Sequence, residues 1–192
     1  MRDPDRIGLP AAPQATLAAA FFARWWWILP LAIFVRLFFA RLNVAYPMIG
    51  HDFWYFFQWL LAGRAHVAEQ GFLPMRWTPY FCGGMVGYGN PQDLFYSPLQ
   101  LLALALDPWP ATQLWILLLL LAGYAGWFLF ARDALAIPRD WSHALSLMVL
   151  ACGFHLLHAA AGHVGFLPFP LIGLLLWLLY KPGGGLPRAL PG

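Results

Sequence analysis

The sequence predicts an all-α integral membrane protein with about four transmembrane helices and one large extracytoplasmic loop that carries two interfacial helices. Hydrophobic residues make up 61% of the 192 residues and charged residues only 10%, whereas soluble domains carry about 25% charged residues. The mean hydropathy is +0.64. Several apolar runs are long enough to cross the roughly 30 Å hydrocarbon core of a bilayer. The lipid bilayer is therefore the first predicted partner, and no nucleic-acid partner is expected.

Four apolar runs are predicted to span the membrane. They cover residues 21–44, 111–131, 141–161 and 166–180. The first is predicted to be an uncleaved signal anchor, because it contains Arg36 and Arg41 and no small-residue cleavage site follows it. Residues 1–20 are predicted to be a cytoplasmic tail. Residues 181–192 are predicted to be a Gly/Pro-rich C-terminal tail, at which a longer protein could have been truncated.

The predicted outer loop, about residues 45–110, contains two apolar runs of half the spanning length. Residues 53–62 and 99–106 suit interfacial helices better than spans. Ser97-Pro98 provides an N-cap and a first-turn proline for the second of them. The Gly-, Pro- and Tyr-rich stretch between the two runs predicts loop structure. Cys82 in this loop and Cys152 in the third span are not expected to form a disulfide.

The basic residues predict the orientation. Seven of them fall on one side of the predicted spans: Arg2, Arg6, Arg24, Arg132, Arg139, Lys181 and Arg188. The large loop holds two basic residues, Arg64 and Arg76, and four acidic ones, Asp52, Glu69, Asp93 and Asp107. Because basic residues favour the cytoplasmic side, both termini are predicted inside and the large loop outside.

Asp52 stands directly before the first short apolar run, in the sequence GHDFWYFFQWLL (50–61). A carboxylate beside hydrocarbon is costly unless it is paired, hydrated or functional. One interpretation is an N-cap at the start of an interfacial helix. The other is a general base or metal ligand at the membrane boundary. In a helix, one face would carry Asp52, Phe56, Trp59, Gly63 and His66.

Arg36 lies inside the first predicted span. It could extend its guanidinium to the interface, or it could bind a phosphate or carboxylate, with Asp52 as a candidate. The segment GGMVGYGN (83–90), which contains Gly84, Tyr88 and Asn90, is most simply a turn. Its backbone N–H groups could also bind an anion. Arg76 and Tyr80 nearby would suit a phosphate or a sugar.

Histidines gather near the predicted third span. Cys152, His155, His158 and His163 invite a metal or haem interpretation. Their spacing on one helix matches no familiar metal site, and a haem needs a ligand from across the bundle. The simpler expectation is that these histidines are packed or hydrogen-bonded at the outer end of the span.

The order of these parts resembles the N-terminal module of the GT-C membrane glycosyltransferases. Within that superfamily it is most similar to the bacterial multi-pass YfhO-type proteins and to those described as 6-pyruvoyl-tetrahydropterin synthase-related. The resemblance rests on Asp52 after the first span and on LPMRWTPYFCGGMVGYGNPQDLFYSPL (73–99), which is similar to an "R/W-W-x-P-x-x-x-x-G-x-P…YPPL" pattern. It rests also on GHVGFLPFPLIGLLLW (162–177), similar to a "GH…P" turn into a span.

The resemblance implies transfer of a sugar from a polyprenyl-phosphate donor at the outer face of a bacterial inner membrane. It implies that Asp52 is the catalytic base. The implied substrate-binding residues are Arg36, His51, Arg76, Tyr80, Gly84, Tyr88, Asn90 and His163. Metal use varies in that superfamily; a divalent ion would need Asp93 beside Asp52. Members of it are usually longer, so the chain is expected to be an N-terminal portion or a short accessory protein.

Two alternatives stay open. The chain could be a non-catalytic membrane subunit whose outer loop docks a protein partner. It could also be a haem or metal protein that uses His155, His158 or His163.

Overall fold

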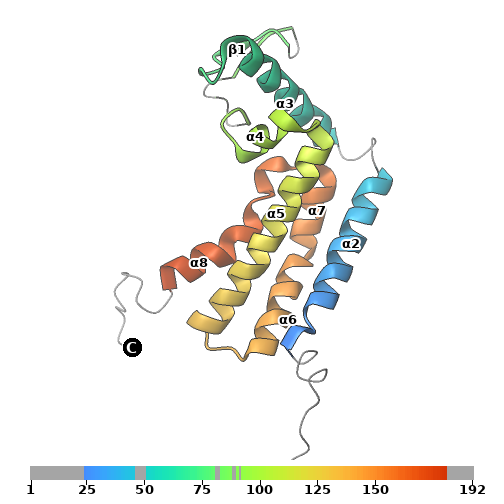
Figure 1. Cartoon of the computed structure of the whole chain (residues 1–192), viewed down its shortest axis with the longest axis vertical. Coiled ribbons are helices and arrows are strands. Elements are labelled where there is room, and N and C mark those ends of the chain that lie inside the picture. Colours follow the sequence, from blue (N-terminus) through green and yellow to red (C-terminus); the bar gives the residue numbers. More distant parts are fainter. Residues whose placement is uncertain (1–23, 46–50, 81–82, 88–89, 91, 181–192) are drawn as a thin grey trace, which may run out of the picture.

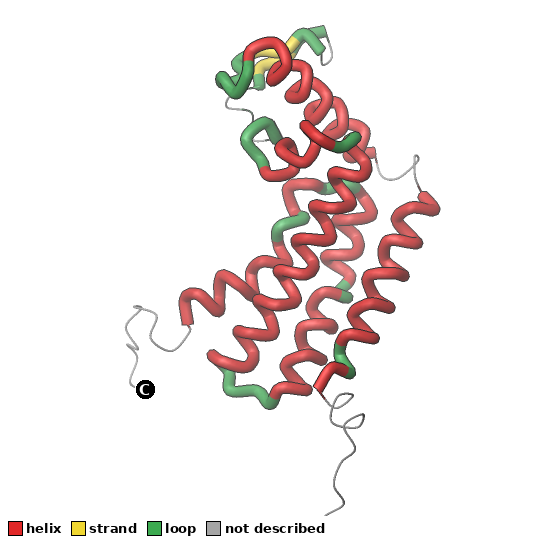
Figure 2. The backbone as a smooth tube through the Cα atoms, in the orientation of Figure 1, coloured by secondary structure: helices red, strands yellow, loops and turns green. Residues whose placement is uncertain are grey.

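The computed structural model describes residues 24–45, 51–80, 83–87, 90 and 92–180. It is mostly helical, with 75% of the described residues in helices. An elongated bundle of helices carries a smaller cap at one end (Figures 1 and 2). The bundle consists of α2 (Ile28–Ala45), α5 (Pro108–Leu129), α6 (Arg139–Leu150), α7 (Gly153–Ala161) and α8 (Ile172–Tyr180). The cap consists of α3 (His51–Gln70), a short hairpin and α4 (Pro98–Ala105). The predicted tails, residues 1–20 and 181–192, lie outside the described residues, as does Cys82.

Two helical segments are long and apolar enough to cross a bilayer by length and composition. The first, Pro108–Ala134, consists of α5 (Pro108–Leu129) and a π-helical turn, Phe130–Ala134. The second, Arg139–Ala161, consists of α6 (Arg139–Leu150) and α7 (Gly153–Ala161). They coincide with the second and third predicted spans. The break between α6 and α7 was not predicted, and Cys152 lies there as a free thiol.

The regular helices that correspond to the first and fourth predicted spans are shorter than those predictions. The first corresponds to α2 (Ile28–Ala45). The fourth, 166–180, lies within an apolar helical segment, Val164–Tyr180, which is shorter than a full span and is not one regular α-helix. Two 3₁₀ turns, Val164–Phe166 and Phe169–Leu171, precede α8 (Ile172–Tyr180). Prolines 168 and 170 explain the difference, since proline lacks an N–H and disfavours helical geometry in the residue before it. Nine residues of α-helix span only about 14 Å.

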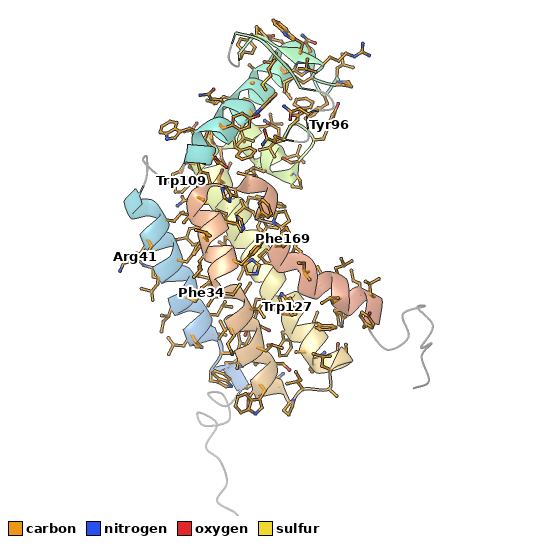
Figure 3. All side chains as sticks on the ribbon, turned by 180° about the vertical axis from the view of Figure 1, so that it is seen from behind. Phe34, Arg41, Tyr96, Trp109, Trp127 and Phe169 are labelled. Atoms are coloured by element: carbon orange, nitrogen blue, oxygen red, sulfur yellow. The ribbon has the colours of Figure 1, made fainter. Side chains whose placement is uncertain are left out.

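Close packing joins α8 to α5 through glycines on both helices. An ideal Cβ added at Gly126 would lie 2.6 Å from the Cα of Leu174, and one added at Gly173 would lie 2.5 Å from Trp127 Cγ. Figure 3 labels Trp127, the residue of α5 that meets Gly173. Small residues of this kind let two helix backbones approach closely in a bilayer.

Gly126→Ala is expected to destabilise the bundle by about 1–3 kcal/mol, because the new methyl group forces the α5 and α8 backbones apart. Gly153→Ala is the matched control, since an ideal Cβ at Gly153 meets nothing within 4 Å. Thermal unfolding in detergent, followed by circular dichroism, measures both variants. Equal melting temperatures for the two would contradict the close α5–α8 contact.

The lower end of the bundle is held by aromatic stacking between α2, α5 and α6. The His143 ring lies between Trp27, at 4.8 Å, and Phe128, at 4.3 Å between ring centroids. The Tyr124 hydroxyl lies 2.7 Å from His143 Nδ1. Trp26 Nε1 also donates to Asp140 Oδ1 at 2.9 Å. These contacts attach the start of α2 to its neighbours.

The cap is built on α3 (His51–Gln70), which is twice as long as the predicted ten-residue run. Its second half is rich in the helix-favouring residues Ala, Arg, Glu and Gln, so propensity continues the helix where hydrophobicity falls. The predicted face is confirmed: Phe56, Trp59 and His66 are buried. Gly63 is buried too, and the Gln100 side chain packs on it.

Helix α4 (Pro98–Ala105) confirms the second predicted short helix. The Ser97 hydroxyl accepts a hydrogen bond from the Gln100 backbone N–H at 3.1 Å, as an N-cap does. The Gln100 side chain donates to the Leu60 carbonyl at 3.1 Å, which fastens α4 to α3. Part of the predicted loop forms a small antiparallel hairpin instead, β1 (Trp77–Thr78) with β2 (Met85–Val86).

Candidate functional site

A cavity of about 520 Å³ opens where the cap meets the bundle. Three segments that are far apart in the sequence form its walls: the first turns of α3, the loop before α4, and the turn that follows α7. Its lining consists of Asp52, Phe56, Gln92, Leu94, His158, His163, Gly165 and Phe166.

Asp52 is held at the mouth of this cavity by its neighbour Phe53. Phe53 is fully buried and packs edge-on against Trp109 of α5, with 5.7 Å between ring centroids. Figure 3 shows Trp109 at this junction of cap and bundle. Because Phe53 points into the core, the adjacent Asp52 side chain is left 50% exposed. Asp52 therefore stands half-exposed, beside apolar side chains.

His163 is brought to Asp52 by the glycine that ends α7. Gly162 has a φ of +83°, in the left-handed region that favours glycine. An ideal Cβ there would lie only 2.6 Å from the backbone nitrogen of Phe53. The start of α3 thus rests directly on Gly162, and the next residue, His163, faces the Asp52 carboxylate.

The polar groups of the cavity form a row. His163 Nε2 lies 3.5 Å from Asp52 Oδ2, and His163 Nδ1 lies 2.6 Å from His158 Nδ1. One of the two Nδ1 atoms must carry the proton for this short contact to be a hydrogen bond. The His158 ring stacks on Phe166 with 4.3 Å between centroids. The arrangement can orient Asp52 and His163 and can accept or return a proton at the carboxylate.

The structure does not bring the hairpin residues to Asp52. The Tyr80 hydroxyl donates to the Glu69 carboxylate, and Glu69 follows Asp52 by almost five turns of α3, or about 25 Å. The hydrogen bond with Glu69 raises the pKa of Tyr80. Arg76 and Gly84 lie at the same far end (Figure 1). The expectation that these three share one site with Asp52 is wrong.

Arg36 also lies away from the cavity. It is exposed on α2, and the ionic partner of Asp52 among the described residues is His163 rather than this arginine. The side chain of His51 and the whole of Tyr88 lie outside the described residues.

The segment before α4 is organised by side chains that cap its own turns. Asn90 Oδ1 accepts from the Gln92 N–H, and Asp93 Oδ1 accepts from the Phe95 N–H, both at 2.9 Å. Burial raises the pKa of Asp93. These turns aim Gln92 at the cavity. The N–H of Gly87 donates to the Arg76 carbonyl and that of Asn90 to the Gly87 carbonyl, which favours the turn interpretation over an anion site.

A hard divalent ion held by carboxylates does not fit this lining. Hard divalent ions take carboxylate oxygens, and Asp52 is the single carboxylate of the described lining. Asp93 is engaged with Phe95 instead. Within the described residues, no three His, Cys, Asp or Glu side chains converge as ligands would. Nor do Cys152 and His155 join the two histidines of the cavity.

Sequence reasoning missed two features of the site. Gln92 carried no signal, because its position depends on the turns around it. The pairing of His158 with His163, in contrast, did have a signal in the sequence. The His163 N–H donates to the His158 carbonyl at 3.0 Å. This is the hydrogen bond of a Schellman motif, in which a glycine ends the helix and the side chains of the two bonded residues often come into contact. The motif H-x-x-x-G-H (158–163) therefore predicts that contact.

Comparisons with known proteins found no significant match. No family model, no curated protein and no solved structure is similar enough to this chain to assign it to a family.

Proposed function

We propose that this chain forms the Asp52-containing part of a membrane glycosyltransferase, which transfers a sugar from a polyprenyl-phosphate donor at the outer face of the inner membrane. One observation carries the proposal. The half-exposed Asp52 carboxylate lies 3.5 Å from His163 Nε2, in a cavity of about 520 Å³ at one end of the apolar bundle. Such a cavity is large enough for a sugar phosphate.

The proposed topology has α2, α5 and the α6–α7 pair crossing the bilayer, with α8 entering it as the fourth membrane helix. The bias of basic residues supports it, because the turn with Arg132 and Arg139 then faces the cytoplasm. The cap and the Asp52 cavity lie at the other end of α5, next to Trp109. The carboxylate then stands at the depth of lipid headgroups, where a polyprenyl phosphate carries its sugar.

The proposed reaction needs one base. Asp52 takes the proton of the acceptor hydroxyl, whose oxygen attacks the anomeric carbon of the donor sugar. The bond from that carbon to the phosphate oxygen breaks, and the leaving phosphate keeps the electron pair. His163, held by His158, orients the carboxylate and, when protonated, donates to an oxygen of the phosphate.

The full chain in proteoliposomes, supplied with polyprenyl-phosphate sugars carrying a radiolabel, tests the proposal. We expect label to pass to an acceptor in a membrane extract, and to do so only when the donor is present in the leaflet facing Asp52. Absence of transfer from every polyprenyl-phosphate sugar tested would contradict catalysis by this chain.

A second candidate function, docking of a membrane protein partner, is favoured by the surface of the hairpin end. Phe72, Leu73, Trp77 and Val86 are each 55–63% exposed there. Clustered exposed apolar side chains are typical of interaction surfaces. A partner that copurifies in equal amounts and is lost on Trp77→Ser, while Asp52→Asn leaves function intact, would select this candidate over the transferase.

A further inference from the structure

A second cleft lies against α3, with walls of aromatic and polar side chains. Its volume is about 540 Å³, and its main lining residues are Trp54, Phe57, Gln58, Leu61, Asp107 and Trp109. It shares no lining residue with the Asp52 cavity. Trp54 follows Asp52 by two residues, about 200° around the helix, so the two openings lie on opposite sides of α3.

The aromatic part of the cleft offers a flat, accessible surface. Phe57 and Trp109 are buried and form its floor, with 6.2 Å between their ring centroids. Trp54 stands at the side, 6.4 Å from Phe57, and is 49% exposed. An indole in this position can take the apolar face of a ligand on its ring while its edge stays in water.

The polar part of the cleft contains a carboxylate that does not cap its helix. Asp107 is the N-cap of α5, but its side chain makes no capping hydrogen bond. Proline at residue 110 contributes to this, because the third helical position, one of the two that an N-cap side chain usually bonds, then has no N–H to donate. The Asp107 side chain is 85% exposed and lies 3.7 Å from Arg64 Nη1.

These groups match the surface of a neutral sugar. A pyranose ring has an apolar C–H face, which suits the Trp54 indole, and a rim of hydroxyls. The Asp107 carboxylate can accept from two hydroxyls, and the Gln58 amide can both donate and accept. The exposed Arg64–Asp107 pair keeps this end of the cleft wet, which disfavours a lipid chain. The negative charge of Asp107 also disfavours an anionic headgroup.

From this geometry we propose that the Trp54–Asp107 cleft binds a neutral pyranose saccharide. The site is separate from the Asp52 cavity, and saccharide binding there does not depend on transfer at Asp52. It lies at the end of α5 that the proposed topology puts on the outer face, where extracellular glycans are present.

Saturation-transfer difference NMR on the full chain in lipid nanodiscs tests this inference. The probes are lactose, cellobiose, maltose and N,N′-diacetylchitobiose. We expect at least one to bind, and Trp54→Ala and Asp107→Asn each to weaken its binding about tenfold. Trp54→Phe keeps a ring and is expected to retain most of the affinity.

The control is Trp141→Ala, which removes a tryptophan that is 69% exposed at the opposite end of the bundle. It should leave binding unchanged, as should Asp52→Asn. The inference is overturned if no probe binds at about 10 mM, or if Trp54→Ala binds as wild type does. The Trp54 fluorescence is the difference between the emission of wild type and that of Trp54→Phe. Quenching of this difference by lipids with brominated chains, unaffected by any saccharide, would assign the cleft to an acyl chain and also overturn the inference.

Discussion

Asp52→Asn is expected to lower the rate of sugar transfer by about 10²–10⁴-fold, the usual contribution of a general base. Asparagine has nearly the same shape as aspartate, but it cannot take a proton from the acceptor. The side chain is half-exposed, so the change should leave the melting temperature nearly unaltered. Donor binding should also be retained, and the loss should therefore appear in kcat rather than in KM.

Glu69→Gln is the matched control for this experiment. It makes the same chemical change on the same helix, about 25 Å from Asp52. It should preserve transfer, although it weakens the contact with Tyr80. His163→Gln should give a smaller loss than Asp52→Asn, of about tenfold, since glutamine can still donate to the carboxylate. Transfer at the wild-type rate by Asp52→Asn would remove Asp52 from the mechanism.

Gly162→Ala is expected to destabilise the protein by about 3 kcal/mol and to reduce transfer together with stability. Two physical effects combine. A side chain at a φ of +83° is strained, and the added Cβ would lie 2.6 Å from the Phe53 backbone nitrogen. To relieve the contact, α3 must move away from the end of α7, and the separation of Asp52 from His163 then grows.

Two further glycine variants separate these effects. Gly153→Ala lies at the start of α7, away from the cavity lining, and an ideal Cβ there meets nothing within 4 Å, so it should retain both stability and transfer. Gly162→Asn tolerates the left-handed conformation better than alanine, yet it still meets Phe53. If Gly162→Asn restores transfer, strain rather than contact is responsible. Thermal unfolding and transfer rates, measured side by side, give the answer.

Much of the fold could be predicted because its signals are local. Long apolar runs predicted the segments Pro108–Ala134 and Arg139–Ala161. Ser97-Pro98 predicted the start of α4. The failures were also local in origin: prolines 168 and 170 interrupt the last helix, and helix-favouring residues extend α3 beyond its apolar half.

The candidate site depended on contacts that no local pattern contains. Asp52 and His163 had been associated only through resemblance, and their 3.5 Å contact arises because Phe53 rests on Gly162. The same tertiary structure separates Asp52 from Arg76, Tyr80 and Gly84. A rigid helix carries the hairpin about 25 Å from the cavity, whereas sequence proximity had suggested one common loop.

Local signals were therefore enough to place the apolar helices and to put a carboxylate at the head of α3, because hydrophobicity, proline and capping act within a few residues. The partners of that carboxylate depend instead on how distant segments pack. The close approach of two backbones at Gly162 pairs Asp52 with His163 and His158, and the packing of α3 on α5 opens a second cleft beside Trp54.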